Sequence, residues 1–398
     1  MAARAGSGWP TGRECRFRLG DLQLRSGRIL ADAHLSYLVL GQLKADRSNL
    51  VLLPTAYGAW PEDLSWTVGP ILDPQRWCVV VVSQLGNGRS SSPSDADPPL
   101  ESGGWPVDHS DNLRAQIRLL EEVFQVESPA LVYGWSMGAQ QAYHWAVLEP
   151  QRPQRICCLC GTARTTPHNR LFLLSLRQAL TADPAWDGRR FRATPEQGLR
   201  SFALIYASWA ASQAFYRRGR HRQLGYTSVE DYVERAWLPA YRRHDPHNLV
   251  GMLDVWLACD VAAALASWPG LGSAGAAARA GPPPAAHRAV PHPAAVQPVP
   301  AHRAATESAA TDSAATDSAA AADPLADALG RIQARASVIA ARHDLYFTPE
   351  DCAHEASLIP AARWLLLESD LGHRAGNPRD DPAVQALIRA EVEALCAT

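Results

Sequence analysis

The stretch Leu131-Val132-Tyr133-Gly134-Trp135-Ser136-Met137-Gly138-Ala139-Gln140 decides how this chain folds. Its first residues are strand formers and its last residues favour a helix, so the sequence predicts a tight strand-to-helix turn at Ser136. The pattern is Gly-x-Ser-x-Gly, whose glycines let the backbone turn sharply and let strand and helix approach closely. Such a turn exposes the serine hydroxyl above a sheet, and we interpret Ser136 as a nucleophile. The alternative is that Ser136 only caps the helix.

Apolar runs before this turn indicate a sheet covered on both faces. Residues 50–53 and 78–82 are apolar without alternation, which is typical of parallel strands in an α/β sandwich. Residues 15–40 alternate polar and apolar, which favours antiparallel strands. Asp111 is expected to cap the next helix, whose apolar side chains recur at helical spacing as far as Val123.

The alternation of predicted strands and helices is interrupted twice in the second half of the chain. Residues 198–214, 229–242 and 249–264 each look like one helix, with no strand-like run between them, which predicts an all-helical lid. An Ala/Pro-rich tract with a short Ala-Thr-Asp-Ser repeat follows and predicts disorder, because it has too few large apolar residues to form a core. The expected segments are a first core part at 1–163, the lid at 164–265, the disordered insertion at 266–323 and a second core part at 324–398.

The second core part completes the predicted sheet. Residues 336–341 and 363–367 are apolar runs that predict two further strands, and a helix over 382–395 closes the chain. Asp344 follows the first of these strands and His373 the second. The carboxyl ends of such strands are where open α/β sheets bind their ligands.

Composition narrows the choice of partner. The chain has 398 residues, 47% of them apolar and 20% charged, with 38 basic against 40 acidic side chains. This near-neutral balance favours neither nucleic acid nor an anionic membrane as partner, so we expect a small-molecule ligand. The first ten residues lack the apolar core of a secretory signal and no run approaches the ~20 residues of a membrane span, so a cytoplasmic protein is expected.

The eight cysteines are expected to be reduced thiols. Cys157, Cys158 and Cys160 share one apolar run and no second Cys/His pair with metal-binding spacing accompanies them. Buried strand positions are therefore expected, and no metal site.

A serine becomes a useful nucleophile when an imidazole takes its proton and a carboxylate holds that imidazole in place. In α/β-hydrolases the three occur in the chain order Ser, Asp or Glu, His. Ser136, Asp344 and His373 follow this order. Asp351 and Asp370 are the rival acids, and we favour Asp344 because Asp351 falls inside a helix start and Asp370 is too close to His373.

Two backbone N–H groups are expected to stabilise the oxyanion. One belongs to Met137, at the N-terminus of the helix after the nucleophile. The other belongs to the loop after residues 50–53, and we assign it to Ala56, to within one position either way.

Several motifs together resemble the homoserine O-acetyltransferase-like branch of the α/β-hydrolase superfamily. They are Gln84-Leu85-Gly86-Asn87-Gly88 with Ser90-Ser91-Ser92-Pro93, the elbow 134–138, Asp183-Pro184-Ala185-Trp186 before Gly198-Leu199, Asp344, and Gly372-His373. The resemblance covers nearly the whole chain except 266–323. It implies the α/β-hydrolase fold, a mostly parallel sheet flanked by helices with a helical lid, and a Ser-His-Asp acyl-transfer enzyme, often a homodimer, that uses no cofactor.

Two departures from that family concern the substrate. The homoserine enzymes carry an aspartate directly after the catalytic histidine and an arginine shortly after the Gly-Leu pair. Here Arg374 and Ala203 stand at those places. A zwitterion that loses both partners forfeits ~1.5–3 kcal/mol per charged hydrogen bond, which argues against homoserine as acceptor. The Gly-His-Arg-Ala-Gly-Asn-Pro ending instead resembles hydrolase-like members of the branch.

The sequence therefore predicts an enzyme that transfers a short acyl group from an ester or thioester to water or a small alcohol. Tyr57, Trp135 and Arg374 are the expected substrate contacts. Two alternatives stay open: an authentic homoserine O-acetyltransferase that uses acetyl-CoA, and a non-catalytic binding protein of the same fold.

Overall fold

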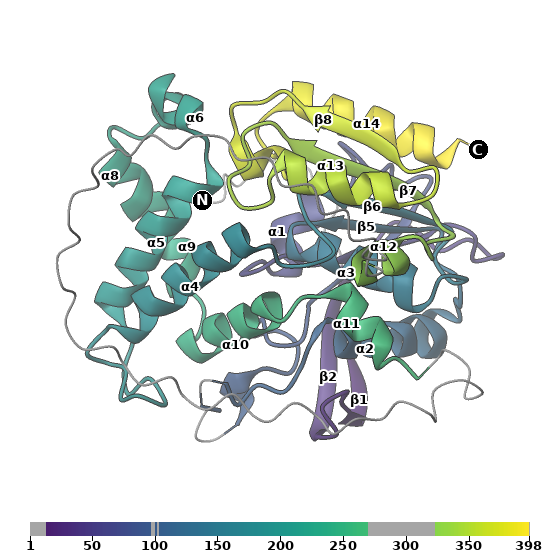
Figure 1. Cartoon of the computed structure of the whole chain (residues 1–398), viewed down its shortest axis with the longest axis horizontal. Coiled ribbons are helices and arrows are strands. Elements are labelled where there is room, and N and C mark those ends of the chain that lie inside the picture. The colour runs from purple at the N-terminus through teal and green to yellow at the C-terminus, as the bar shows by residue number, and fades with distance from the viewer. Residues whose placement is uncertain (1–12, 97–99, 102, 270–322, 398) are drawn as a thin grey trace, which may run out of the picture. The chain divides into compact units, whose positions relative to one another are not determined.

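An eight-stranded sheet forms the centre of the protein (Figure 1). The computed structural model describes residues 13–96, 100–101, 103–269 and 323–397. The strands are β1 (Arg13–Gln23), β2 (Ile29–Leu40), β3 (Leu50–Pro54), β4 (Cys78–Val82), β5 (Leu131–Trp135), β6 (Arg155–Leu159), β7 (Arg335–Ala341) and β8 (Arg363–Leu367). Their order across the sheet is β1-β2-β4-β3-β5-β6-β7-β8.

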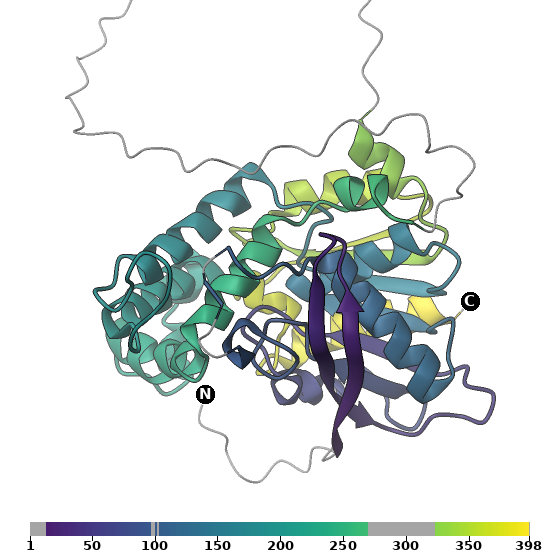
Figure 2. The ribbon, with the colours of Figure 1, turned by 90° about the horizontal axis from the view of Figure 1, so that it is seen from below.

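The strand directions agree with the hydrophobic patterns. β1 and β2 form an antiparallel hairpin, which stands at one edge of the sheet in Figure 2, and β2 is antiparallel to β4. All other neighbours are parallel. Because β3 lies between β4 and β5, the loop that follows β3 has the ends of those two strands on either side.

The sheet is buried on both faces, which explains the unalternating apolar runs. Along β4, Val80 and Val82 pack into one hydrophobic cluster while Val79 and Val81 pack into another. The first cluster includes side chains of α2 (His109–Leu119), α3 (Met137–Leu148) and α13 (Pro349–Leu358). The second includes side chains of α14 (Pro382–Cys396) and of the short α1 (Pro61–Leu64).

Helices also fill the connection between β6 and β7. They are α4 (Pro167–Thr181), α5 (Glu196–Ala210), α6 (Gln213–Arg217), α7 (Arg220–Gln223), α8 (Val229–Tyr232), a π-helical turn (Val233–Trp237), α9 (Leu238–Arg242), α10 (Pro246–Leu257), α11 (Val261–Ala266) and α12 (Pro324–Leu329). We call α4 to α10 the cap. In both ribbon views most of the cap lies beside the sheet, whereas α11 packs against α3 (Figures 1 and 2).

Two of the long helices expected in the cap region are each broken in two. The stretch 198–214 divides because Ser212 accepts a hydrogen bond from the Phe215 N–H at 3.0 Å and so begins a new helix. The stretch 249–264 divides in the same way, because the Asp260 carboxylate accepts hydrogen bonds from two N–H groups at the start of α11. Both are side-chain caps that interrupt an otherwise continuous apolar pattern.

The helix expected to begin at Asp111 begins three residues earlier. Asp108 is its N-cap, and Asp111 is the N3 partner of a reciprocal capping box. The helix also ends sooner, because a π-helical turn over Leu120–Phe124 adds a residue to the repeat. Val123 is therefore 43% exposed rather than buried.

The described residues up to Trp268 and from Pro324 onward form one compact unit. Residues 270–322, which contain most of the tract expected to be disordered, lie outside the described residues, as do residues 1–12. No disulfide joins any of the described cysteines, and Cys157, Cys158 and Cys160 are fully buried, as expected. None of the described helices has the length and apolar character needed to cross a bilayer.

Candidate active site

Ser136 occupies a strained turn between β5 and α3. Its backbone has φ 59° and ψ −126°, a conformation that costs a non-glycine residue about 1–3 kcal/mol. Ser136 stands at the N-cap position of α3, but its side chain caps no N–H group. The reading of Ser136 as a simple helix cap therefore fails, and the turn presents the hydroxyl rather than using it.

The two glycines of the turn are required by close packing. A Cβ atom on Gly134 would lie 2.2 Å from the carbonyl oxygen of Gly138. A Cβ atom on Gly138 would lie 2.6 Å from the carbonyl oxygen of Pro54, at the end of β3. The first turn of α3 thus touches both its own strand and the loop that follows β3.

Asp344 and His373 form a buried hydrogen-bonded pair. His373 Nδ1 lies 2.6 Å from Asp344 Oδ2, and both residues are 3% exposed. The other oxygen, Asp344 Oδ1, accepts hydrogen bonds from the N–H groups of Tyr346 and Phe347, both at 3.1 Å. The carboxylate is therefore fixed by the turn after β7, and the Nδ1–H tautomer of His373 leaves Nε2 as the nitrogen that can accept a proton.

The two alternative acids, Asp351 and Asp370, have other structural roles. Asp351 is in the first turn of α13, where its N–H donates to Thr348. Asp370 forms ion pairs with Arg218 and Arg220, at 3.3 and 3.2 Å.

Aromatic rings enclose the His373 imidazole. The Tyr346 ring centroid is 4.3 Å away and the Phe347 centroid 5.6 Å away. Trp135 stacks on the imidazole at 5.2 Å with an interplanar angle of 27°, and its Nε1–H donates to the His373 carbonyl at 3.4 Å. Trp135, expected to contact substrate, instead holds the loop that carries His373.

The structure does not join Ser136 to His373 by a hydrogen bond: none of the hydrogen bonds among the described residues links Ser136 Oγ to the imidazole. Such bonds are commonly long in the free enzyme and shorten when substrate binds. The two residues share Trp135, which precedes the serine and stacks on the histidine.

The expected oxyanion donors belong to two neighbouring segments, the loop after β3 and the first turn of α3. Ala56 is 2% exposed and Met137 fully buried, and none of the described hydrogen bonds uses the backbone N–H of either residue. A buried N–H without a partner is rare, because it costs free energy comparable to a lost hydrogen bond. The virtual Cβ of Gly138 lies 3.6 Å from the Thr55 carbonyl oxygen, which places the Thr55–Ala56 peptide beside the start of α3.

Two other expected substrate contacts have structural partners. Tyr57 is 7% exposed, and its hydroxyl donates to the Leu249 carbonyl in α10 at 2.9 Å. Arg374 donates to the Tyr232 hydroxyl at 2.8 Å and lies over the Phe215 ring. Its guanidinium thus binds side chains of the cap helices.

The sequence patterns did not reveal an aromatic cluster between the cap and the His373 loop. Its members, contributed mainly by the cap, are Tyr57, Phe172, Phe202, Tyr206, Tyr241, Trp256 and Tyr346. Ala203, at the place where the homoserine enzymes carry an arginine, is fully buried in the same hydrophobic cluster. Aromatic residues spread over four helices and two loops have no common period, so their convergence could not be predicted from the sequence.

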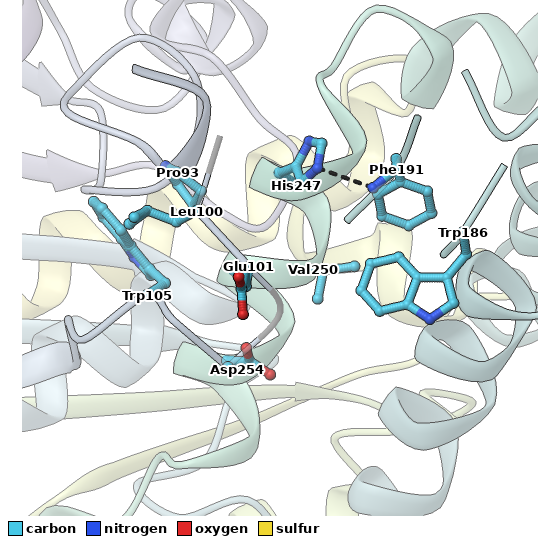
Figure 3. A pocket seen from close by; sticks show the side chains of 11 residues that line it. Pro93, Leu100, Glu101, Trp105, Trp186, Phe191, His247, Val250 and Asp254 are labelled. Atoms are coloured by element: carbon cyan, nitrogen blue, oxygen red, sulfur yellow. Dashed lines mark hydrogen bonds between the residues drawn. The ribbon is translucent and has the colours of Figure 1, made fainter. Parts of the chain in front are cut away.

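Two cavities in the described part of the chain lie away from the candidate triad, and neither is lined by Ser136 or His373. The first, about 10 Å³ and thus about the size needed by one water, is lined by Trp105, Trp186, Phe191, Glu101 and Asp254 among others (Figure 3). His247 closes one side by accepting a hydrogen bond from the Phe191 N–H at 3.1 Å (Figure 3). The second, about 470 Å³, is an open groove between β1 and α2.

One group of side chains has the donor types of a metal site. Donor atoms of Cys160, Asp344 and His373 lie within 4.8 Å of one another. Burial raises the pKa of the Cys160 thiol well above its ordinary value, which disfavours the thiolate that a metal requires. The mutual hydrogen bond of Asp344 and His373 also occupies those two donors, so this set fits a metal poorly.

Comparison with known proteins supplies a context for this geometry. The family model described as the alpha/beta hydrolase fold matches residues 49–237. An ethyl acetate hydrolase of Pseudomonas veronii is 33% identical over 361 residues, which are 89% of this chain and 87% of that protein. A homoserine O-acetyltransferase of Geobacter sulfurreducens is 29% identical over 255 residues, 59% of this chain and 69% of that protein. The solved structure of the acetyl esterase MekB is similar with a TM-score of 0.78 at 30% identity, covering 97% of both chains.

Proposed function

We propose that this chain, which belongs to the α/β-hydrolase family and is homoserine O-acetyltransferase-like, hydrolyses esters of short acyl groups. The proposed catalytic residues are the triad Ser136, His373 and Asp344. Its similarity to esterases supports an acyl-transfer or ester-hydrolysing enzyme. The triad, the acyl length and water as acceptor are the content of the proposal. The buried 2.6 Å contact of His373 with Asp344 beside the strained Ser136 turn carries it.

The reaction has two steps. Ser136 Oγ attacks the carbonyl carbon and passes its proton to His373 Nε2, and the tetrahedral oxyanion accepts hydrogen bonds from the N–H groups of Ala56 and Met137. Collapse expels the alcohol, which takes the proton from His373 and leaves an acyl group on Ser136. Water then attacks this acyl-enzyme, gives a proton to His373, and releases the acid while the proton returns to Ser136. His373 accepts or donates the proton in every transfer, so the proposed reaction uses no cofactor.

A short acyl group and an uncharged alcohol fit the surroundings of the proposed triad. The space between cap and His373 is filled by aromatic side chains such as Phe172, which stacks on Tyr346 at 4.6 Å. Ala203 offers no charge for a substrate carboxylate, and Arg374 is bound to Tyr232. An ethyl acetate hydrolase and an acetyl esterase among the relatives support the same substrate class.

The test is turnover of a chromogenic acetyl ester by the wild type and by Ser136→Ala, with and without homoserine. The proposal expects turnover that Ser136→Ala abolishes and that homoserine leaves unchanged. The exposed Ser208→Ala serves as the matched control and should keep wild-type turnover. Acceleration by homoserine with formation of O-acetylhomoserine, from this ester or from acetyl-CoA, would instead establish an acetyltransferase. Binding of the ester without any Ser136-dependent turnover would establish a non-catalytic protein.

The proposal includes a homodimer formed through the cap. Leu171 and Leu174 of α4 and Leu204 of α5 are 64%, 40% and 50% exposed, and the two helices pack against each other. Burying this apolar face against a second copy supplies the association free energy. Sedimentation should give a dimer for the wild type and a monomer for Leu171→Glu; equal masses for both would refute this interface.

A further inference from the structure

The motif that begins at Gln84 has no role in the two-step reaction, although it is among the features that carry the family resemblance. Gln84 follows β4 and is fully buried. Its side-chain Nε2 donates a hydrogen bond to the Thr55 carbonyl oxygen, in the loop after β3. Its Oε1 is buried without a partner among the described residues. The Gln84 amide thus binds this carbonyl through its nitrogen while its oxygen stays unpaired. Because buried polar side-chain atoms normally have a hydrogen-bond partner, this arrangement needs an explanation.

The carbonyl that Gln84 binds belongs to the same peptide group as the Ala56 N–H. A trans peptide is planar, and its C=O and N–H point in opposite directions. Fixing the Thr55 carbonyl toward Gln84 therefore fixes the Ala56 N–H toward the opposite side.

The strand order shows what lies on that opposite side. β3 runs between β4, which Gln84 follows, and β5, which Ser136 follows. With its carbonyl held by Gln84, the Thr55–Ala56 peptide turns its N–H away from that side chain, and β5 is the strand on the other flank of β3. The contact between the virtual Cβ of Gly138 and the Thr55 carbonyl, at 3.6 Å, confirms that this peptide lies against the start of α3.

The remaining hydrogen bonds around Thr55 hold the neighbouring parts of the same loop. The Thr55 N–H donates to the Val82 carbonyl at 2.9 Å, and the Gln84 N–H donates to Thr55 Oγ1 at 3.1 Å. Asn87 reaches the far end of the loop, where its Nδ2 donates to the Ala59 carbonyl at 3.2 Å. These bonds fix the loop as a whole, whereas the Gln84 side chain acts on the peptide that bears the donor.

We infer that Gln84 is a positioning residue that aims the Ala56 N–H at the oxyanion. This inference rests on the proposed function, because it needs a reaction that forms an oxyanion at Ser136. Gln84 touches neither substrate nor Ser136 and acts only through the Thr55–Ala56 peptide. Its effect must therefore appear in the transition state and not in the binding of the ground-state ester.

Two variants of Gln84 separate the hydrogen bond from the polarity of the side chain. Gln84→Met keeps the length of the side chain and removes the donor. Gln84→Asn keeps the amide but shortens its reach by one methylene. Gln116→Met is the matched control, because Gln116 is equally buried and binds Gln141 and Trp145 away from the oxyanion loop.

The measurements are kcat and KM for the chromogenic acetyl ester, the melting temperature, and the inhibition constant of a methyl trifluoromethyl ketone, which forms an oxyanion adduct with a reactive serine. Both Gln84 variants should lower kcat about 10- to 100-fold, raise the inhibition constant by a similar factor and leave KM within about threefold. Gln116→Met should lower the melting temperature without changing kcat or the inhibition constant.

Folded Gln84→Met with wild-type kcat and wild-type ketone affinity would overturn the inference, and so would equal kinetic losses in Gln116→Met. Failure of the proposed function looks different. In that case the wild type itself would show no turnover that depends on Ser136.

Discussion

Glu355 allows a quantitative test of the structure, because it is a buried carboxyl group outside the reaction. It lies on α13, is 3% exposed, and its Oε2 accepts a hydrogen bond from the Ala163 N–H at 2.7 Å. Burial raises the pKa of Glu355 from its ordinary value of 4.5 to about 8, and the hydrogen bonds from the Ala163 and Arg164 N–H groups offset only part of this increase. The folded protein therefore holds a proton on Glu355 at neutral pH that the unfolded chain has lost.

The sign of the effect on stability follows from this difference. Below pH 4.5 Glu355 is protonated in both states and has no effect on the free energy of unfolding. As the pH rises from 4.5 to about 8, the unfolded chain is stabilised by ionisation while the folded protein is not, so the free energy of unfolding falls. At ~1.4 kcal/mol per pKa unit, this loss reaches roughly 3–5 kcal/mol above pH 8.

Glu355→Gln removes the ionisation and retains an oxygen that can accept the Ala163 hydrogen bond. We expect the variant to match the wild type at pH 5 and to be more stable by about 3–5 kcal/mol at pH 9. Urea unfolding followed by tryptophan fluorescence at five pH values between 5 and 9 measures this difference. The exposed Glu350→Gln, on the same helix, is the control. A stability difference between Glu355→Gln and wild type that stays constant from pH 5 to pH 9 would refute the reasoning.

Three further substitutions test other parts of the account. Gly138→Ala places a Cβ atom 2.6 Å from the Pro54 carbonyl and should lower the free energy of unfolding by about 1–3 kcal/mol, together with activity; a wild-type urea midpoint would contradict this. Asp344→Asn should leave the fold intact and lower kcat about 10³- to 10⁴-fold, because His373 loses the carboxylate that sets its tautomer, and near-wild-type kcat would reject Asp344 as the acid. Tyr57→Phe leaves a cap carbonyl without its donor and should cost about 1 kcal/mol in urea unfolding with kcat within threefold, so a large loss of kcat would show that the hydroxyl acts on substrate.

The strand arrangement and the order of the candidate site could be predicted because their signals are local. The runs at 50–53 and 78–82 are apolar without alternation because both faces of the sheet are covered. The turn at Ser136 needs glycines at two fixed offsets, and those glycines are visible in the sequence. Asp344 and His373 could be chosen because each lies in the loop that follows an apolar strand.

Contacts between distant residues could not be predicted in this way. Trp135 and His373 are 238 positions apart, and no sequence pattern in either segment predicts that the two rings stack. Arg374 was expected at the site from its place beside His373, but its long side chain reaches Tyr232 instead. Single side-chain caps, at Ser212 for example, also broke helices whose apolar pattern continues through the break.

The central claim is that Ser136 carries the acyl group during turnover. The most direct measurement is an acid quench of the enzyme during hydrolysis of an acetyl ester, followed by peptide mapping by mass spectrometry. The account predicts one acetylated peptide, the one containing Ser136, which appears within the first turnover and is absent from Ser136→Ala. An acetyl group on another residue, or turnover that persists in Ser136→Ala, would contradict it.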